Sequence, residues 1–111
     1  MLVYKILRPS EWDAFDASGT FDGAPVDRES GFIHLSSREQ VAETARRHFA
    51  EDPVLVIVAI DDATLGATLR WESSSQRGAF PHAYGQLRRA DVAAVYRAAG
   101  ASDVDRVLEA E

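Results

Sequence analysis

The sequence contains no cysteine among its 111 residues. Disulfide bonds, thiol catalysis and every cysteine-ligated metal site are therefore excluded. It also has no apolar run near the roughly 18 residues that a membrane-spanning helix needs, because its longest run, residues 54–60, has the length of a strand. The first residues lack the charged start, apolar core and cleavage site of a signal peptide. These absences predict a cytoplasmic protein with no membrane partner.

The sequence also lacks an excess of positive charge. It has 18 acidic and 12 basic residues, for a net charge of −6, whereas a general nucleic-acid binder depends on cations that contact phosphates. The arginine clusters at residues 46–48 and 88–89 suffice for one small phosphorylated ligand, or are solvated arginines on exposed faces. We therefore expect a small nucleotide or phosphorylated ligand rather than a nucleic acid, and leave the oligomeric state open.

The composition, with 46% apolar and 27% charged residues, is that of an ordinary globular protein. The length allows one core, so residues 1–111 are expected to form a single domain. Alternating or β-branched apolar residues predict five strands, at residues 2–7, 31–36, 54–60, 69–72 and 91–97. The last of these segments is ambiguous between strand and helix, and its valines favour the strand. The run at 54–60 is apolar throughout, which is typical of a central strand covered on both faces.

Two helices are expected in the N-terminal half. One opens at residues 9–13, where Ser10 and Asp13 have the spacing of a capping box, and the other runs from Ser37, with Gln40 completing its box, to Phe49. Loops are expected at residues 19–28 and 61–68, with a flexible loop at 73–78 that closes over a ligand. The tail from Ser102 forms a short helix or a strand. This order of elements predicts an α+β fold.

His34 is the first candidate site residue, in the segment Gly-Phe-Ile-His-Leu-Ser. In a strand, Ile33 and Leu35 point to the face opposite His34, so Phe32, His34 and Ser36 share one side. That side is then the floor of a pocket whose imidazole contacts a ligand, because histidine titrates near neutral pH. The alternative is a structural histidine bonded to a backbone carbonyl.

A second candidate segment is Phe-Pro-His-Ala-Tyr-Gly at residues 80–85. His82 and Tyr84 lie between a proline and a glycine, which predicts a loop, and loops on rigid scaffolds often carry binding groups. Both side chains face the same way if the backbone is extended. The alternative is a turn shaped by Pro81 in which Tyr84 simply packs.

Arg70 and Glu72 flank Trp71 on a predicted strand, so both charges share one face. A mutual salt bridge at a sheet edge is the competing structural interpretation. His48 lies on the apolar stripe of the second helix and is expected in the core.

Metal and serine-nucleophile sites have little support. His34, His82 and Glu72 form a histidine–histidine–carboxylate set, but local ligand spacing is absent, and we predict no metal site. Ser36 lacks the G-x-S-x-G context of a nucleophile elbow.

These motifs resemble domain-of-unknown-function family nine-five-two over roughly residues 3 to 97. The resemblance rests on residues 4–7, Trp12, residues 31–36, 44–45, 48–49, 69–72 and 80–85. That family is similar in fold to the ADP-ribosyltransferase superfamily, which implies a mixed, split β-sheet with an NAD-binding cleft. NAD is then the implied co-substrate, and no other cofactor is called for.

The same resemblance implies roles for individual residues. His34 matches the strand histidine that holds the nicotinamide ribose, Tyr84 or His82 takes the stacking role, and Glu72 is the nearest acidic candidate for the ribose hydroxyl. The chain has no clear late glutamate pair. We therefore predict His34, His82 and Glu72 as catalytic residues. The predicted ligand contacts are His34, Ser36, Arg70 and Tyr84.

Three functions remain open from the sequence. The first is a transferase or hydrolase acting on NAD or an ADP-ribose-like nucleotide. The second is a non-catalytic module that binds a small nucleotide or phosphorylated metabolite in the same cleft. The third is an interaction protein whose histidines are structural.

Overall fold

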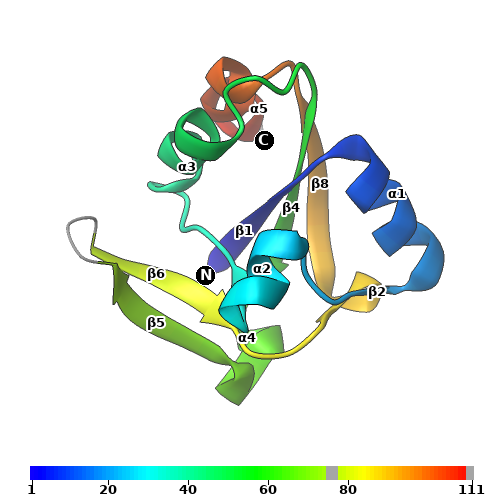
Figure 1. Cartoon of the computed structure of the whole chain (residues 1–111), viewed down its shortest axis with the longest axis vertical. Helices are drawn as coiled ribbons and strands as arrows, with labels where there is room; N and C mark the ends of the chain where they lie inside the picture. The colour runs from blue at the N-terminus through cyan, green and yellow to red at the C-terminus, as the bar shows by residue number, and fades with distance from the viewer. Residues whose placement is uncertain (75–77, 110–111) are drawn as a thin grey trace.

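A three-stranded antiparallel sheet forms the centre of the fold in the computed structural model, which describes residues 1–74 and 78–109 (Figure 1). Its strands are β1 (Leu2–Leu7), β4 (Leu55–Asp61) and β8 (Val92–Ala98), in the order β1-β4-β8. The central position predicted for the apolar run is confirmed, because every residue from Leu55 to Ile60 is fully buried.

The alternation of β4 divides the core between the two faces of this sheet. Val56, Val58 and Ile60 pack into one hydrophobic cluster with Trp12 and Phe15 of helix α1 (Pro9–Ser18). The other face is covered by α3 (Val41–His48) and α5 (Val104–Glu109) (Figure 1). The tail, expected to be a short helix or a strand, forms helix α5.

A second antiparallel sheet holds the candidate residues. Its order is β3-β6-β5, with β3 (Ile33–His34), β6 (Gly78–Ala83) and β5 (Leu69–Ser74). The loop predicted around His82 is wrong, because His82 lies in β6. Of the flexible loop predicted at 73–78, residues 73, 74 and 78 belong to strands, and residues 75–77 lie outside the described part. A third, two-stranded sheet pairs β2 (Thr20–Phe21) with β7 (Leu87–Arg88).

The sheets are split as expected, but the expectation of a mixed sheet is wrong. Each strand pair in the described residues is antiparallel. The strand predicted over residues 31–36 is shorter, and beyond β3 it continues only as an isolated bridge between Tyr4 and Ser36. The architecture is a single α+β domain.

The loop predicted at residues 19–28 instead contains strand β2 and helix α2 (Pro25–Ser30). Proline fits the first turn of a helix because its missing N–H needs no partner there. The Asp27 carboxylate accepts the N–H of Ala24, the residue before the helix. Gly31 ends the helix at φ +88°, a conformation that favours glycine. Local capping chemistry therefore makes a helix from a segment rich in turn residues.

Capping also explains why other helices begin at residues different from those predicted. Helix α1 begins at Pro9, and Glu11 rather than Asp13 closes the box by accepting the Arg8 N–H. The turn predicted at 61–68 is helical, with α4 (Asp62–Leu65) and a 3-10 turn, η1 (Gly66–Thr68), because Asp61 caps the Ala63 N–H.

The side chain of Gln40 accepts the Ser37 N–H as predicted, although α3 itself begins at Val41 and ends at His48. Short 3-10 turns at η2 (Arg89–Asp91) and η3 (Ala101–Asp103) flank β8. Within residues 1–74 and 78–109, none of the helices combines the length and apolar character needed to cross a membrane.

Candidate functional site

The β3-β6-β5 sheet brings the two predicted histidines together. Ile33, Ala83 and Leu69 are register partners on the face that packs into the core. The next position on each strand points the opposite way. His34 therefore lies directly across from His82, and His82 lies across from Arg70. The ring centroids of the two histidines are 5.6 Å apart.

His34 is paired with a buried carboxylate that sequence reasoning missed. Its Nδ1 lies 2.7 Å from Oδ1 of Asp27, and its backbone N–H donates to the same oxygen at 3.0 Å. The other carboxylate oxygen accepts from Lys5 Nζ at 2.9 Å and from the Ala24 N–H at 2.8 Å. Asp27 is 1% exposed and Lys5 6% exposed, so this is an enclosed and fully hydrogen-bonded ion pair.

These contacts fix the charge of Asp27. Burial by itself raises the pKa of this carboxyl, but the hydrogen bonds from His34 and Lys5 and the Lys5 charge outweigh burial and hold the pKa well below its usual value. An ionised carboxylate only accepts hydrogen bonds. His34 therefore donates from Nδ1–H, and in its neutral form Nε2 carries the free lone pair.

His82 has a second carboxylate partner. Its Nδ1 lies 2.7 Å from Oε1 of Glu72, which also accepts the Tyr84 hydroxyl at 2.6 Å. The hydrogen bonds from Tyr84 and His82 lower the pKa of Glu72, and the bond to Glu72 raises the pKa of Tyr84. By the same logic as for His34, neutral His82 presents Nε2 as its free atom.

The aromatic ring of Phe32 joins the two histidines. It stacks on His82 at 4.0 Å between centroids and lies 4.7 Å from His34 and 5.4 Å from Tyr84. The guanidinium of Arg70 lies 5.2 Å from the Tyr84 ring centre. The polar partners of Glu72 in the described residues are His82 and Tyr84. Glu72 therefore does not form the salt bridge with Arg70 that was the alternative interpretation.

Both histidines line one cavity of about 700 Å³. Its wall includes the buried Lys5–Asp27 pair and the hydroxyls of Ser36 and Thr44, which bond to each other at 3.1 Å. Away from His34 and His82, side chains from β1, β6 and α3 and from residues next to these elements also line the cavity: Ile6, Arg8, His48, Phe49 and Phe80. The cavity therefore combines apolar area with a few convergent polar groups, as small-molecule sites do.

The structure separates the predicted site residues into two groups. His34, His82 and Ser36 line the cavity, whereas Glu72, Arg70 and Tyr84 are not among its lining residues. Glu72 contacts His82 instead and reaches the cavity only through that ring. Within the described residues, no group of three or more histidine, aspartate and glutamate side chains is placed to hold a metal ion.

The prediction that His48 is a core residue is wrong. It is exposed at the end of α3 and lines the cavity. A helical stripe indicates which way a side chain points, but the core side of α3 opens into the cavity at its last residue.

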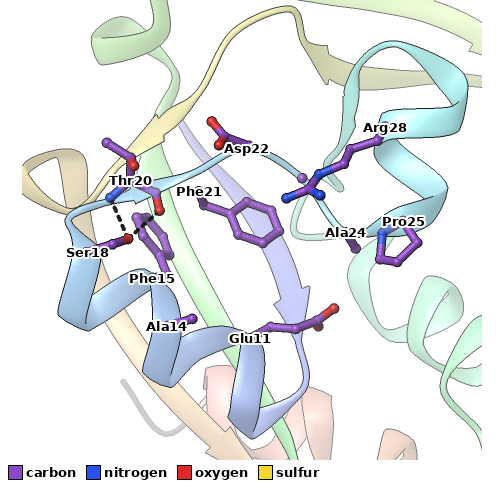
Figure 2. Close-up of a pocket in the computed structure, with 11 residues that line it drawn as sticks. Glu11, Ala14, Phe15, Ser18, Thr20, Phe21, Asp22, Ala24, Pro25 and Arg28 are labelled. Atoms are coloured by element: carbon purple, nitrogen blue, oxygen red, sulfur yellow. Dashed lines mark hydrogen bonds between the residues drawn. The ribbon is translucent and has the colours of Figure 1, made fainter.

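A second, smaller cavity of about 280 Å³ lies between α1 and the start of α2 (Figure 2). In this view Glu11 lies below the Phe21 ring and the Arg28 guanidinium lies beside it. Ala24 and Pro25 line both cavities, so the start of α2 forms the wall between them. None of the predicted site residues lines this second cavity.

Comparison with known proteins gives a family and a fold but no activity. Residues 6–95 match the family described as "Protein of unknown function (DUF952)". The crystal structure of protein CC0527 from Caulobacter crescentus is 44% identical, with a TM-score of 0.82 over 86% of this chain and 83% of that one. The solution NMR structure of CC0527 is 46% identical, with a TM-score of 0.75 over 85% and 81%. No curated protein matches.

Proposed function

The chain belongs to the DUF952 family of proteins of unknown function, and from its site we propose that it binds a nucleotide of the NAD or ADP-ribose class and cleaves or transfers its ribosyl group. One observation carries the proposal: two histidines on adjacent strands, each bonded to a carboxylate, line one cavity with their rings 5.6 Å apart. The histidine–carboxylate arrangement fixes the tautomer of a catalytic imidazole in many enzymes.

Cleavage of the bond between nicotinamide and ribose requires a general base but no general acid. When the bond between nicotinamide and ribose breaks, its electron pair neutralises the pyridinium, and nicotinamide leaves without a proton. The incoming water or acceptor hydroxyl must lose a proton as its oxygen bonds to the ribose carbon. His34, whose side chain is 41% exposed and whose neutral form carries its lone pair on Nε2, is the base in this proposal.

His82 has a different role. Its side chain is only 12% exposed and is held between the Phe32 ring and Glu72. A ring fixed in this way is suited to orienting the ribose, because a ribose hydroxyl can donate a hydrogen bond to the free lone pair of Nε2. Glu72 then acts by positioning His82, which replaces the direct ribose contact that the resemblance implies.

The cavity supports a nucleotide as the ligand class. Its volume of about 700 Å³ lies within the range of small-molecule and cofactor sites. Phe49 and Phe80 offer apolar surface for a base, and the Ser36 and Thr44 hydroxyls offer polar contacts. Arg8 lies 5.0 Å over the Phe49 ring, and its guanidinium is paired with Asp52 at 3.0 and 3.2 Å, so a ligand phosphate would compete with that carboxylate for its charge.

Calorimetric titration of NAD and ADP-ribose, together with a turnover assay for nicotinamide release, tests the proposal. We expect His34→Ala to weaken binding by less than about tenfold, but to lower kcat by on the order of 100-fold or more, because the base is lost. His82→Ala should weaken ADP-ribose binding by about tenfold or more, equivalent to roughly 1.4 kcal/mol.

Arg97→Gln, an exposed change on β8, is the matched control and should leave both quantities unchanged. Both histidine variants should remain folded, since removing one hydrogen-bonded partner costs about 1–3 kcal/mol. Absence of binding by the folded wild-type protein at millimolar nucleotide would contradict the proposal.

A non-catalytic binding module is the second candidate function, and one observation favours it. Glu72 is turned to His82 and Tyr84 rather than into the cavity, so Asp27 is the one carboxylate that lines the cavity among the described residues. Tight nucleotide binding that depends on His82, with no turnover in wild type, would select this alternative.

A further inference from the structure

Lys5 is the only lysine in the chain, although arginine is abundant. It lies in the middle of β1 between apolar neighbours and is 6% exposed. Burying an ammonium group is costly unless it is paired and hydrogen-bonded. Burial lowers the pKa of Lys5, and the Asp27 charge opposes that effect. Because burying this ammonium group is costly, we expect Lys5 to have a role beyond packing.

The ammonium contacts both residues of the Asp27–His34 pair, of which Asp27 is buried and His34 is half-buried. Its Nζ donates to Oδ2 of Asp27 at 2.9 Å and to the backbone carbonyl of His34 at 3.1 Å. The His34 ring holds the other oxygen of the same carboxylate at 2.7 Å. Lys5 and the imidazole therefore bind different oxygens of the one Asp27 carboxylate.

We infer that Lys5 is a positioning residue that keeps His34 neutral, with the proton on Nδ1 and the lone pair on Nε2. Lys5 and Asp27 together carry no net charge, so protonating His34 would leave an excess positive charge next to a buried ion pair. Without Lys5, an imidazolium at His34 would be the only cation paired with the Asp27 carboxylate. The catalytic value of this arrangement rests on the proposed function, but the charge arrangement itself does not.

The other groups around His34 fit this assignment. His82 on β6 faces its ring, and Asp27 on α2 and Lys5 on β1 form its charged surroundings. Glu11 on α1 acts on Lys5 and stabilises its charged form. Of these two carboxylates, Asp27 is the one that hydrogen-bonds His34, so Lys5 acts on the imidazole through this carboxylate.

The test is NMR of the histidine ring nitrogens at pH 7.5 without ligand, because their shifts distinguish imidazolium from each neutral tautomer. We expect wild type and Lys5→Arg to show neutral His34 with Nδ1–H. We expect Lys5→Met to show His34 as imidazolium, while the His82 signals keep their wild-type positions. Neutral Nδ1–H His34 in folded Lys5→Met would overturn the inference.

The double variant Lys5→Met/Asp27→Asn keeps the test decisive if Lys5→Met does not fold, because it buries no unpaired charge. The amide introduced by Asp27→Asn offers either an oxygen or an NH₂ group to the ring. We therefore expect His34 to lose its single tautomer, with Nε2–H becoming detectable. A pure Nδ1–H tautomer in this variant would show that the ion pair does not set the state of His34.

These outcomes are separable from those of the proposed function. The ring-nitrogen spectra need no nucleotide, so they can support the role of Lys5 even if nucleotide binding fails. If turnover is also found, Lys5→Met should lower kcat by on the order of 100-fold with KM changed little, and Lys5→Arg should recover most of the loss. A kcat unchanged by Lys5→Met would remove the catalytic role of Lys5 while leaving the base assignment of His34 intact.

Discussion

Replacing Asp27 by asparagine should be one of the most destabilising polar changes available in this protein. The carboxylate accepts four hydrogen bonds, from Lys5 Nζ, the Ala24 N–H, and the backbone and ring of His34. The amide has one oxygen for these donors, and its NH₂ group would face either the Lys5 ammonium or His34. Breaking one side of a buried ion pair costs about 3–5 kcal/mol, because the other charge stays buried.

Urea unfolding followed by tryptophan fluorescence measures this loss. Trp12 is buried, so its emission should shift when the core opens. With a urea m-value of about 1.5 kcal/mol/M, the midpoint should fall by about 2–3 M. The control is Asp105→Asn, which removes an exposed ion pair with Arg38 at 2.8 Å and should cost about 1 kcal/mol or less.

The pH dependence of the unfolding free energy gives a second check, because it reports whether Asp27 is ionised in the folded protein. Despite its burial, Asp27 has a lowered pKa in the folded protein because of the hydrogen bonds from His34 and Lys5, whereas an unfolded aspartate titrates near 3.9. Its stabilisation is therefore fully present above about pH 5 and is lost as the pH falls toward the folded-state value. The stability gap between wild type and Asp27→Asn should therefore shrink as the pH falls below about 4. A loss under about 1 kcal/mol at pH 7 would refute the buried-pair account.

Two further predictions concern the second histidine–carboxylate pair and the helix that carries the first. Tyr84→Phe removes a hydrogen bond that lowers the Glu72 pKa, so carboxyl-carbon NMR should show that pKa rising toward its usual value. An unchanged titration of Glu72 would contradict the Tyr84–Glu72 bond. Gly31→Ala places a side chain on a residue with φ +88° at the end of α2, and it should lower the free energy of unfolding in urea by roughly 1 kcal/mol or more. The control, Ala17→Gly at an exposed helical position, should lower it by about 1 kcal/mol or less.

Strand periodicity was enough to predict which face carries His34. Ile33 and Leu35 are buried in the core, and alternation alone places His34 on the other side. The unbroken apolar run around Ile57 likewise marks a strand covered on both faces. These are local signals, and local signals survive folding when one face is clearly apolar.

The partners of the histidines depend on contacts that periodicity does not specify. Asp27 reaches His34 only because Pro25 and Gly31 delimit a short helix where turn residues predicted a loop. Glu72 reaches His82 through the register of β5 and β6, which the pattern within one strand leaves undetermined. One signal pointed to the buried pair, namely a lone charged residue, Lys5, inside an apolar strand.

The central claim is that the cavity lined by His34 and His82 binds a nucleotide through their Nε2 atoms. The most direct test is an NMR titration of ¹⁵N-labelled protein with ADP-ribose, NAD and nicotinamide, observing backbone amides and histidine ring nitrogens. We predict saturable shifts of Nε2 in both rings, together with the amides of Ser36 and Phe80, while the amide of Arg97 stays unchanged. Unchanged Nε2 signals at millimolar ADP-ribose and NAD would contradict the account.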